Sequence, residues 1–425
     1  MIEPAAAPVH GEVPASSGVL APLRHDAYRW LVLGRFTSFL GNAVAPIALA
    51  FAVLDLTGSV ASLGLVVGAR SLANVVLLLL GGVVADRLPR PLVLQGSSYA
   101  AALTQGLVAA SVLGGFASVP LLVGLGVLNG ATAAMSMPAA SALTPQTVPP
   151  ADLRPANALL RIVINSAMVG GAAAGGTLVA VVGPGWGIAA DAVTFLVAGL
   201  CFARIRLVTS RDPGPRARPI ADLREGWSEF VSRQWVWVVV LQFMVVNAAL
   251  TGGANVLGPT IADETIGRQA WGLVLGAYTA GLLVGGLVAV RLQPRRALRL
   301  GVLLTAVEAV PLLALAHAPR LAVLLAAMFA AGLAIEQFGI AWDVSLQEHV
   351  PRERLARVYS YDMLGSFIAI PVGQIAVGPL TEAYGTTATL TGAAVLVLLA
   401  TAGGLCSRSV RTLERGTRAA APVEA

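Results

Sequence analysis

The sequence predicts an all-α membrane protein whose helices fall into two halves. Only 12% of the 425 residues are charged and the mean hydropathy is +0.79, whereas a soluble domain is typically about 25% charged. Apolar runs of about 20 residues, the length that crosses a hydrocarbon core about 30 Å thick, recur along the chain. One long polar connection near the middle separates these runs into two sets.

Each apolar run ends at a charged residue or at a Pro/Gly-rich break, and these boundaries predict twelve transmembrane helices. In chain order the predicted spans are roughly 29–54, 60–85, 91–113, 119–141, 157–181, 186–206, 235–258, 270–291, 297–317, 321–343, 357–381 and 386–406.

The polar connection, residues 207–234, carries Leu223, Trp227, Phe230 and Val231 at helical spacing. This pattern predicts a short amphipathic helix on the membrane surface. The predicted domains are a flexible cytoplasmic tail at 1–27, an N-terminal six-helix bundle at 28–206, a cytoplasmic linker at 207–234, a C-terminal six-helix bundle at 235–406 and a second cytoplasmic tail at 407–425.

The arginines predict the orientation. All 28 basic residues are arginine, and if the N-terminus is cytoplasmic the loops on the opposite side receive only Arg268 and Arg320. Such an excess of positive charge on one side places both termini in the cytoplasm. We therefore expect a multi-pass protein of the cytoplasmic (inner) membrane with the lipid bilayer around it. The arginines that give the chain its net charge of +6 serve to orient it in the membrane. No nucleic-acid partner is therefore expected.

The two halves resemble each other in sequence. At an offset of 202 residues, Val148, Pro149, Leu153, Gly171 and Gly176 coincide with identical residues at the fifth helix of the second half. A second similarity pairs LGLVVGARSLA (63–73) with WGLVLGAYTAG (271–281). Duplication of this kind is the usual construction of secondary transporters.

A charged turn between the second and third spans carries a motif, Gly82-x-x-x-Asp86-Arg87-x-x-Arg90. It resembles the signature loop of the major facilitator superfamily, G-x-x-x-D-R-x-G-R followed by a basic residue, although Pro89 and Pro91 depart from that pattern. The resemblance implies the major facilitator fold and a lock of the outward-facing form on the cytoplasmic side. The alternative is a charged turn that only sets topology. The second half has Val290 at the position of Asp86, so only the first copy could form this lock.

Further residues resemble the branch that contains the enterobactin exporter and macrolide-efflux proteins. They are Trp342, Gln347, Pro351, Leu355, Arg357, Asp362, Gly365, Pro371, Gly373 and Gly378, with Pro145, Pro149, Asn157 and Asp191 in the first half. This resemblance implies a monomeric transporter that moves small molecules outward in exchange for protons, by alternating access. The antiporter motif of helix five is only half present, because no proline follows Gly175. Export of a siderophore, uptake of a small solute, and a non-transporting sensor or scaffold remain alternatives.

Polar residues inside spans are costly and usually line a transport path. In the superfamily the first, fourth, seventh and tenth helices line the central cavity, which makes candidates of Arg35, Asn42, Asn129, Gln242, Asn247, Glu336 and Gln337. Glu336 is the first candidate for carrying the coupling proton. The alternative is a carboxylate that pairs structurally with an arginine near the cytoplasmic end.

Other polar residues lie in spans outside that set. Arg70, with Asn74 one turn further on the same face, could meet a substrate anion or form a buried ion pair. Glu308 is similarly deep in the ninth span. Arg161 and Asp362 are predicted to act in gating or interface pairing, with substrate contact as the alternative, and Asp191 is expected to start a helix or to pack.

No enzyme is expected from this sequence. His10 and His25 lie in the tail, and His317 and His349 are isolated in opposite loops, so no metal site is predicted. The chain has no lysine, which excludes a P-loop of the Walker type, and no cofactor is expected. The energy for transport would then come from an ion gradient or from the solute gradient itself.

Overall fold

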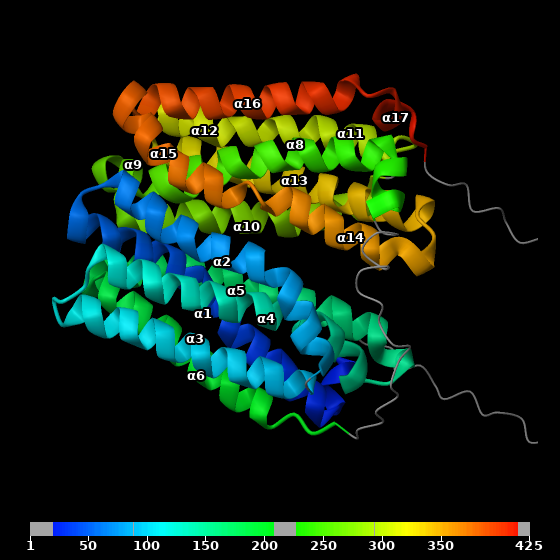
Figure 1. The fold of residues 1–425 in the computed structure, drawn as a ribbon, viewed down its shortest axis with the longest axis horizontal. Coiled ribbons are helices and arrows are strands. Elements are labelled where there is room, and N and C mark those ends of the chain that lie inside the picture. The colour runs from blue at the N-terminus through cyan, green and yellow to red at the C-terminus, as the bar shows by residue number, and fades with distance from the viewer. Residues whose placement is uncertain (1–19, 88, 208–226, 293, 415–425) are drawn as a thin grey trace, which may run out of the picture.

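A computed structural model describes residues 20–87, 89–207, 227–292 and 294–414. Within these residues the chain is almost entirely helical and contains no strand. Long helices run side by side along the molecule, and both ends of the described chain lie at the same end of it (Figure 1). We call this end the terminal side and the opposite end the far side. Most of the two tails and of the linker predicted from the sequence lies outside the described residues.

The helices of the first half are α1 (Asp26–Thr57), α2 (Val60–Arg87), α3 (Arg90–Leu113), α4 (Val119–Thr147), α5 (Leu153–Val182) and α6 (Pro184–Ala203). Those of the second half are α8 (Gln234–Leu250), the π-helical η3 (Thr251–Leu257), α9 (Gly258–Thr265), α10 (Arg268–Arg291), α11 (Ala297–Leu304), η4 (Thr305–Glu308), α12 (Ala309–His317), α13 (Leu321–His349), α14 (Arg352–Phe367), α15 (Ile370–Tyr384) and α16 (Thr386–Cys406). Short helices are η1 (Ala21–Arg24), η2 (Pro150–Asp152) and α17 (Arg408–Thr412).

Eleven segments of the described chain are long and apolar enough to cross a membrane. The prediction of an all-α membrane protein is therefore confirmed, but α3, the third of the twelve predicted spans, is not among the eleven. This helix is 24 residues long and packs against α4 and α6. Five buried polar residues lower the mean hydropathy of α3: Ser97, Ser98, Thr104, Gln105 and Ser111.

Three predicted spans of the second half are interrupted, and each interruption precedes a proline. Pro259 follows the π-helical turns of η3, Pro311 follows the 3₁₀ turn η4, and Pro371 follows the break between α14 and α15. Because proline has no N–H to donate to the carbonyl four residues earlier, regular α-helical bonding is lost there. The seventh span also continues to Thr265, beyond its predicted end at 258.

The helices form two bundles with the same internal packing. In the first, α1 packs against α5 and α6, and α2 against α4. In the second, α10 packs against α13, and α8 against α14 and α16. The main contacts between the bundles are α5 with α10 and α2 with α15, and α2 also contacts η3 and α1 contacts α9. The arrangement is thus pseudo-symmetric, as the duplicated sequence predicts (Figure 1).

Glycines identified in the sequence repeat occupy equivalent positions. A methyl group added at Gly171 would meet the carbonyl oxygen of Leu40 in α1, and one at Gly373 that of Ala248 in α8. The turn that follows α5 uses Gly183 at φ 94°, and the turn after α15 uses Gly385, 202 residues later, at φ 82°. Only glycine adopts such a conformation readily.

Asp191 corrects one expectation. It lies in the interior of α6, seven residues after Pro184, and does not start the helix. Its side chain is fully buried, with 0% exposed. A carboxyl at this position must find partners on neighbouring helices.

Candidate functional site

The bundles approach each other most closely on the far side. A methyl group at Gly176 of α5 would lie 2.8 Å from the Cα of Gly272 in α10, and one at Gly378 of α15 would lie 2.4 Å from the Cα of Ala61 in α2. Toward the terminal side the α5–α10 approach loosens, since a methyl group at Gly276 would lie 3.7 Å from the nearest carbonyl oxygen. Small residues allow this backbone-to-backbone contact, which closes the far side.

An arginine cluster also joins the bundles on the far side. Arg268, at the start of α10, donates to both carboxylate oxygens of Asp55 in α1, at 2.9 and 2.5 Å. It also donates to Asp263 of α9, at 2.8 and 3.0 Å. The guanidinium lies over the Phe51 ring, 4.7 Å from its centroid. Asp263 belongs to the same bundle as Arg268, whereas Asp55 and Phe51 both lie on α1 and link Arg268 to the other bundle.

Arg161 of α5 and Glu336 of α13 form an ion pair between the bundles nearer the terminal side, at 3.5 Å. The Arg161 side chain is 70% exposed and the Glu336 side chain 19%. This contact is longer than the Asp55–Arg268 contact, and its arginine is more exposed while its carboxylate is less exposed. The structure therefore joins two residues that the sequence analysis had assigned to different roles.

Glu336 faces α10 of its own bundle. A methyl group at Gly285 would lie 2.9 Å from the Glu336 Cβ, so the glycine makes room for the acid. The next residue, Gln337, donates from Nε2 to the Gly285 carbonyl oxygen at 2.5 Å. Both candidates on α13 thus lie at the crossing with α10.

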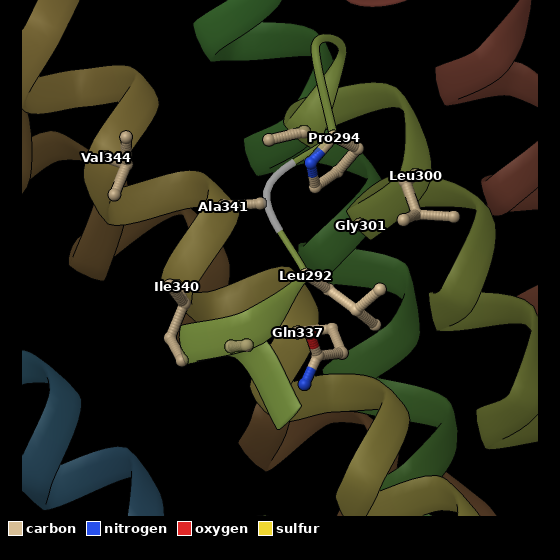
Figure 2. A pocket seen from close by; sticks show the side chains of 10 residues that line it. Leu292, Pro294, Leu300, Gly301, Gln337, Ile340, Ala341 and Val344 are labelled. Carbon is tan, nitrogen blue, oxygen red and sulfur yellow. The ribbon is translucent and has the colours of Figure 1, made fainter. Parts of the chain in front are cut away.

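Gln337 also lines a small pocket on the terminal side, between the end of α10, the start of α11 and α13 (Figure 2). The other side chains around it are apolar, among them Leu292, Leu300, Ile340 and Val344. Among the described residues that line this pocket, Gln337 is the polar side chain, and its amide is already bonded to Gly285; none of these residues is charged.

A buried polar network connects four helices of the first bundle. Arg70 of α2 donates from Nε to the Asn129 side chain of α4 at 2.9 Å, and Asn129 donates to Thr104 of α3 at 3.2 Å. Beside it, Gln105 of α3 donates to Oδ2 of Asp191 in α6 at 2.5 Å. The other Asp191 oxygen, Oδ1, has no hydrogen-bond partner within the described chain.

Asn74 lies one turn from Arg70 on α2. It donates to the Gly130 carbonyl oxygen of α4 at 3.4 Å. Both candidates on α2 are therefore bonded to the neighbouring helix of their own bundle.

The second bundle has its own buried carboxyl. Glu308, 1% exposed, accepts from the Tyr278 hydroxyl at 3.5 Å. In the sequence repeat Tyr278 is the counterpart of Arg70, and the structure supports this equivalence. A methyl group at Gly130 would meet the Arg70 carbonyl oxygen, and one at Gly332 would meet that of Tyr278.

Three further candidates are bonded inside the second bundle. Gln242 donates to Thr305 at 2.7 Å and lies buried against η4 and α16. Asn247 donates to the Ser366 carbonyl oxygen at 2.9 Å. Asp362 accepts from Trp342 Nε1 at 2.9 Å and from the Ser366 hydroxyl at 3.2 Å. The geometry therefore brings Asn247 and Asp362 to the same residue.

The two candidates on α1, Asn42 and Arg35, differ in their hydrogen bonding. Asn42 donates to the Ser38 carbonyl oxygen at 2.9 Å. Arg35 lies over the Phe39 ring, 4.7 Å from its centroid, and its Nε is buried without a hydrogen-bond partner in the described part of the chain.

The charged turn is described only in its backbone. Helix α2 ends at Arg87 and α3 begins at Arg90. The side chains of Asp86 and Arg87 and the packing around Gly82 lie outside what the structure describes, so the predicted lock stays a prediction.

A cluster on the terminal side ties the described end of the linker to the second bundle. Glu229, whose side chain is 9% exposed, accepts from Arg354 at 2.5 Å and also from Arg233. Burial raises the pKa of the Glu229 carboxyl, but hydrogen bonds from Arg354 and Arg233 and their charges outweigh burial, so its pKa lies below the usual value.

Comparison with known proteins decides the family. The family model for the Major Facilitator Superfamily matches residues 31–373. The chain belongs to this superfamily. The chain is also 25% identical over 371 residues to the multidrug efflux pump Tap of Mycobacterium tuberculosis (strain ATCC 25618 / H37Rv), which covers 84% of this chain and 88% of that protein.

A second curated relative is the enterobactin exporter EntS of Shigella dysenteriae serotype 1 (strain Sd197), 25% identical over 276 residues, covering 63% of this chain and 64% of that protein. Both relatives fit the efflux branch that the sequence resembles.

Among solved structures, that of the nucleoside transporter NupG has a TM-score of 0.74 at 15% identity, covering 89% of this chain and 98% of that one. A bacterial homologue of the iron transporter ferroportin, in an inward-facing state, has a TM-score of 0.69 at 20% identity, covering 90% and 98%. At such identities these likenesses show the fold alone.

Sequence reasoning missed Gln105 and Asp55 and gave Asp191 too little weight. A signal existed for the far-side cluster, because Arg268 is one of only two arginines assigned to that side. For Asp191 the signal was its place inside an apolar run. Neither signal identifies the partner, which comes from another helix.

Proposed function

We propose that this chain is a secondary active transporter of the cytoplasmic membrane that exports drugs or hydrophobic metabolites in exchange for protons. Membership of the major facilitator superfamily and the names of the curated relatives support export. The excess of arginine on the terminal side supports cytoplasmic termini. The transporter works as a monomer, since each chain carries both bundles.

The observation that carries the coupling proposal is the Arg161–Glu336 pair between the bundles. The Glu336 carboxyl can either bind a proton or pair with an arginine of the opposite bundle. Protonation of this carboxyl is therefore coupled to separation of the bundles. With Glu336 ionised the pair holds α5 and α13 together, and with Glu336 protonated the attraction is lost. The closed far side then corresponds to an inward-facing state, and rocking of the bundles exposes the other side.

Everted membrane vesicles with an acidic interior provide the test. A fluorescent pH probe reports proton loss when macrolides, dyes or siderophores are added. We expect substrates to dissipate the gradient with the wild-type protein and Glu336→Gln to reduce that rate by about tenfold, because a neutral amide cannot carry the proton. Glu264→Gln removes an exposed carboxylate from α9 and is the matched control.

The outcomes separate the alternatives. A Glu336→Gln variant that dissipates the gradient as fast as the wild type contradicts the role of Glu336, and Glu308 and Asp362 are tested next. A wild-type protein that binds the compounds without moving them supports a sensor or scaffold. Solute accumulation inside right-side-out vesicles would instead identify uptake.

A further inference from the structure

Arg35 is a charged residue inside a membrane span, and no charged partner for it lies among the residues that the structure describes. It lies nine residues after the start of α1, about 14 Å along the helix. Within the part of the chain that the structure describes, its guanidinium makes no ion pair and no hydrogen bond, and its Nε is buried. Its one described interaction is with the face of the Phe39 ring.

The other arginines inside spans of this bundle have polar or charged partners. Arg70 donates to Asn129, and Arg161 pairs with Glu336 across the bundles. An arginine cannot lose its proton to relieve burial, because it remains charged at any physiological pH. A half-buried charge inside a span is costly when it has no partner, so the protein retains in Arg35 a cation whose partner is not part of the described fold.

The side of α1 that carries Arg35 is turned away from two neighbouring helices. Gly34 and Gly41 face α6, where added methyl groups would meet Phe202 and Thr194. Leu40 and Val44 face α5 at Gly171 and Gly175. At 100° per residue, Arg35 falls on the other side of the helix. Helix α1 also contacts η1, α2 and α4 within its bundle.

Phe39 and Asn42 extend the same stripe, four and seven residues after Arg35. The three residues offer a guanidinium, an aromatic ring and an amide along one face of α1. A guanidinium donates in a planar fork that suits a carboxylate or phenolate oxygen. The ring and the surrounding apolar span suit an aromatic body attached to that oxyanion.

We propose that Arg35 binds the oxyanion of the transported molecule, so that the substrates of this protein are organic anions with an aromatic or apolar body. The proposal rests on the transport function proposed above and narrows its substrate class. A bound anion supplies the charge that the fold does not, and Phe39 and Asn42 position the body of the molecule along α1.

The test is equilibrium binding to the purified full-length protein. Three probes share one ring system and differ only in charge: naphthoate, naphthamide and naphthylmethylammonium. We expect the wild type to bind naphthoate about tenfold or more tightly than the other two, since a hydrogen bond to a charged group accounts for a factor of this order. Arg35→Gln should remove this preference, while Arg35→Lys, which keeps the charge, should retain part of it.

Arg206→Gln is the matched control, because Arg206 is an exposed arginine beyond the end of α6. Gel filtration of each variant reports whether it is folded. Equal binding of the three probes by the wild type overturns the proposal, and so does an unchanged naphthoate preference in folded Arg35→Gln. If instead the vesicles show proton-coupled export of cations only, the transport function stands and the anion inference falls.

Discussion

At the scale of single residues, the sequence identifies which charges lie inside the membrane but not what they contact. Arg70 and Asn129 are 59 residues apart, and Gln105 and Asp191 are 86 apart. Each such pair depends on which face a helix turns toward its neighbour. Packing sets the rotation of each helix about its axis. When every face of a helix carries apolar residues, this rotation cannot be inferred from a single sequence.

The Gln105–Asp191 bond leads to a prediction about stability. Gln105→Leu leaves Asp191 Oδ2 without its donor in a site with no access to water. We expect a loss of about 1–3 kcal/mol in the free energy of unfolding, the usual cost of an unsatisfied buried acceptor. Thermal unfolding of the purified protein in detergent measures it.

Gln95→Leu is the control, since Gln95 lies on the same helix and is only half-buried. Adding Asp191→Leu to Gln105→Leu should restore part of the loss, because both polar partners are then removed. Equal melting temperatures for Gln105→Leu and Gln95→Leu would mean that the bond contributes nothing.

At the scale of helices, composition predicted the spans and proline explains their interruptions. The ends of α1, α10 and α16 fall within a few residues of the predicted limits. Pro311 and Pro371 are visible in the sequence, yet a proline can also be accommodated without a break, as Pro46 is inside α1. The π-helical form of η3 had no distinguishing signal in the sequence; in the structure its Gly252 and Gly253 pack closely against α15, α12 and α16.

We expect pH to affect how the described end of the linker, which carries Glu229, attaches to the second bundle. The folded-state pKa of this carboxyl is lowered, so its ion pairs stabilise the attached helix above the unfolded-state pKa, near 4.5, and are lost as the pH falls through the lower folded-state value. A bimane fluorophore on Ser228→Cys, with the native cysteines replaced by serine, reports detachment. We expect a transition below the unfolded-state pKa value of 4.5.

Glu229→Gln serves as the comparison for that titration. It cannot ionise, so the helix should be partly detached at neutral pH and show no acid transition. Phe230 and Tyr361, whose rings lie 5.8 Å apart, still pack in this variant and limit the change. An acid transition of the same midpoint in Glu229→Gln would assign the effect to another group.

At the scale of the whole molecule, the sequence predicted the duplication of the two halves. It did not predict on which side of the molecule the two bundles are closed against each other. The repeat pairs Gly176 with Gly378, and both glycines contact the opposite bundle on the far side. The spacing of these two glycines indicates that helices make close contacts at both positions. It does not say in which state, because one sequence encodes the contacts of every state that the protein adopts.

The far-side cluster predicts how the two states are balanced. Asp55 and Asp263 both bind Arg268, but only Asp55 comes from the other bundle. Asp55→Asn should therefore favour opening of the far side, whereas Asp263→Asn, which removes a contact within one bundle, should not. A bidentate arginine pair at the surface contributes about 1 kcal/mol, so we expect the open-to-closed ratio to rise about fivefold in Asp55→Asn.

Spin labels at Ser118→Cys and Thr387→Cys, exposed on the far side of the first and second bundles, measure that ratio as a distance distribution. The longer component should grow in Asp55→Asn and shrink as salt is lowered in the wild type, because screening weakens an exposed pair. If both aspartate variants open the far side equally, Arg268 acts by ordering α9 and α10 and not by holding the bundles together. The glycine crossings at Gly176 and Gly378 would then be what keeps this side closed.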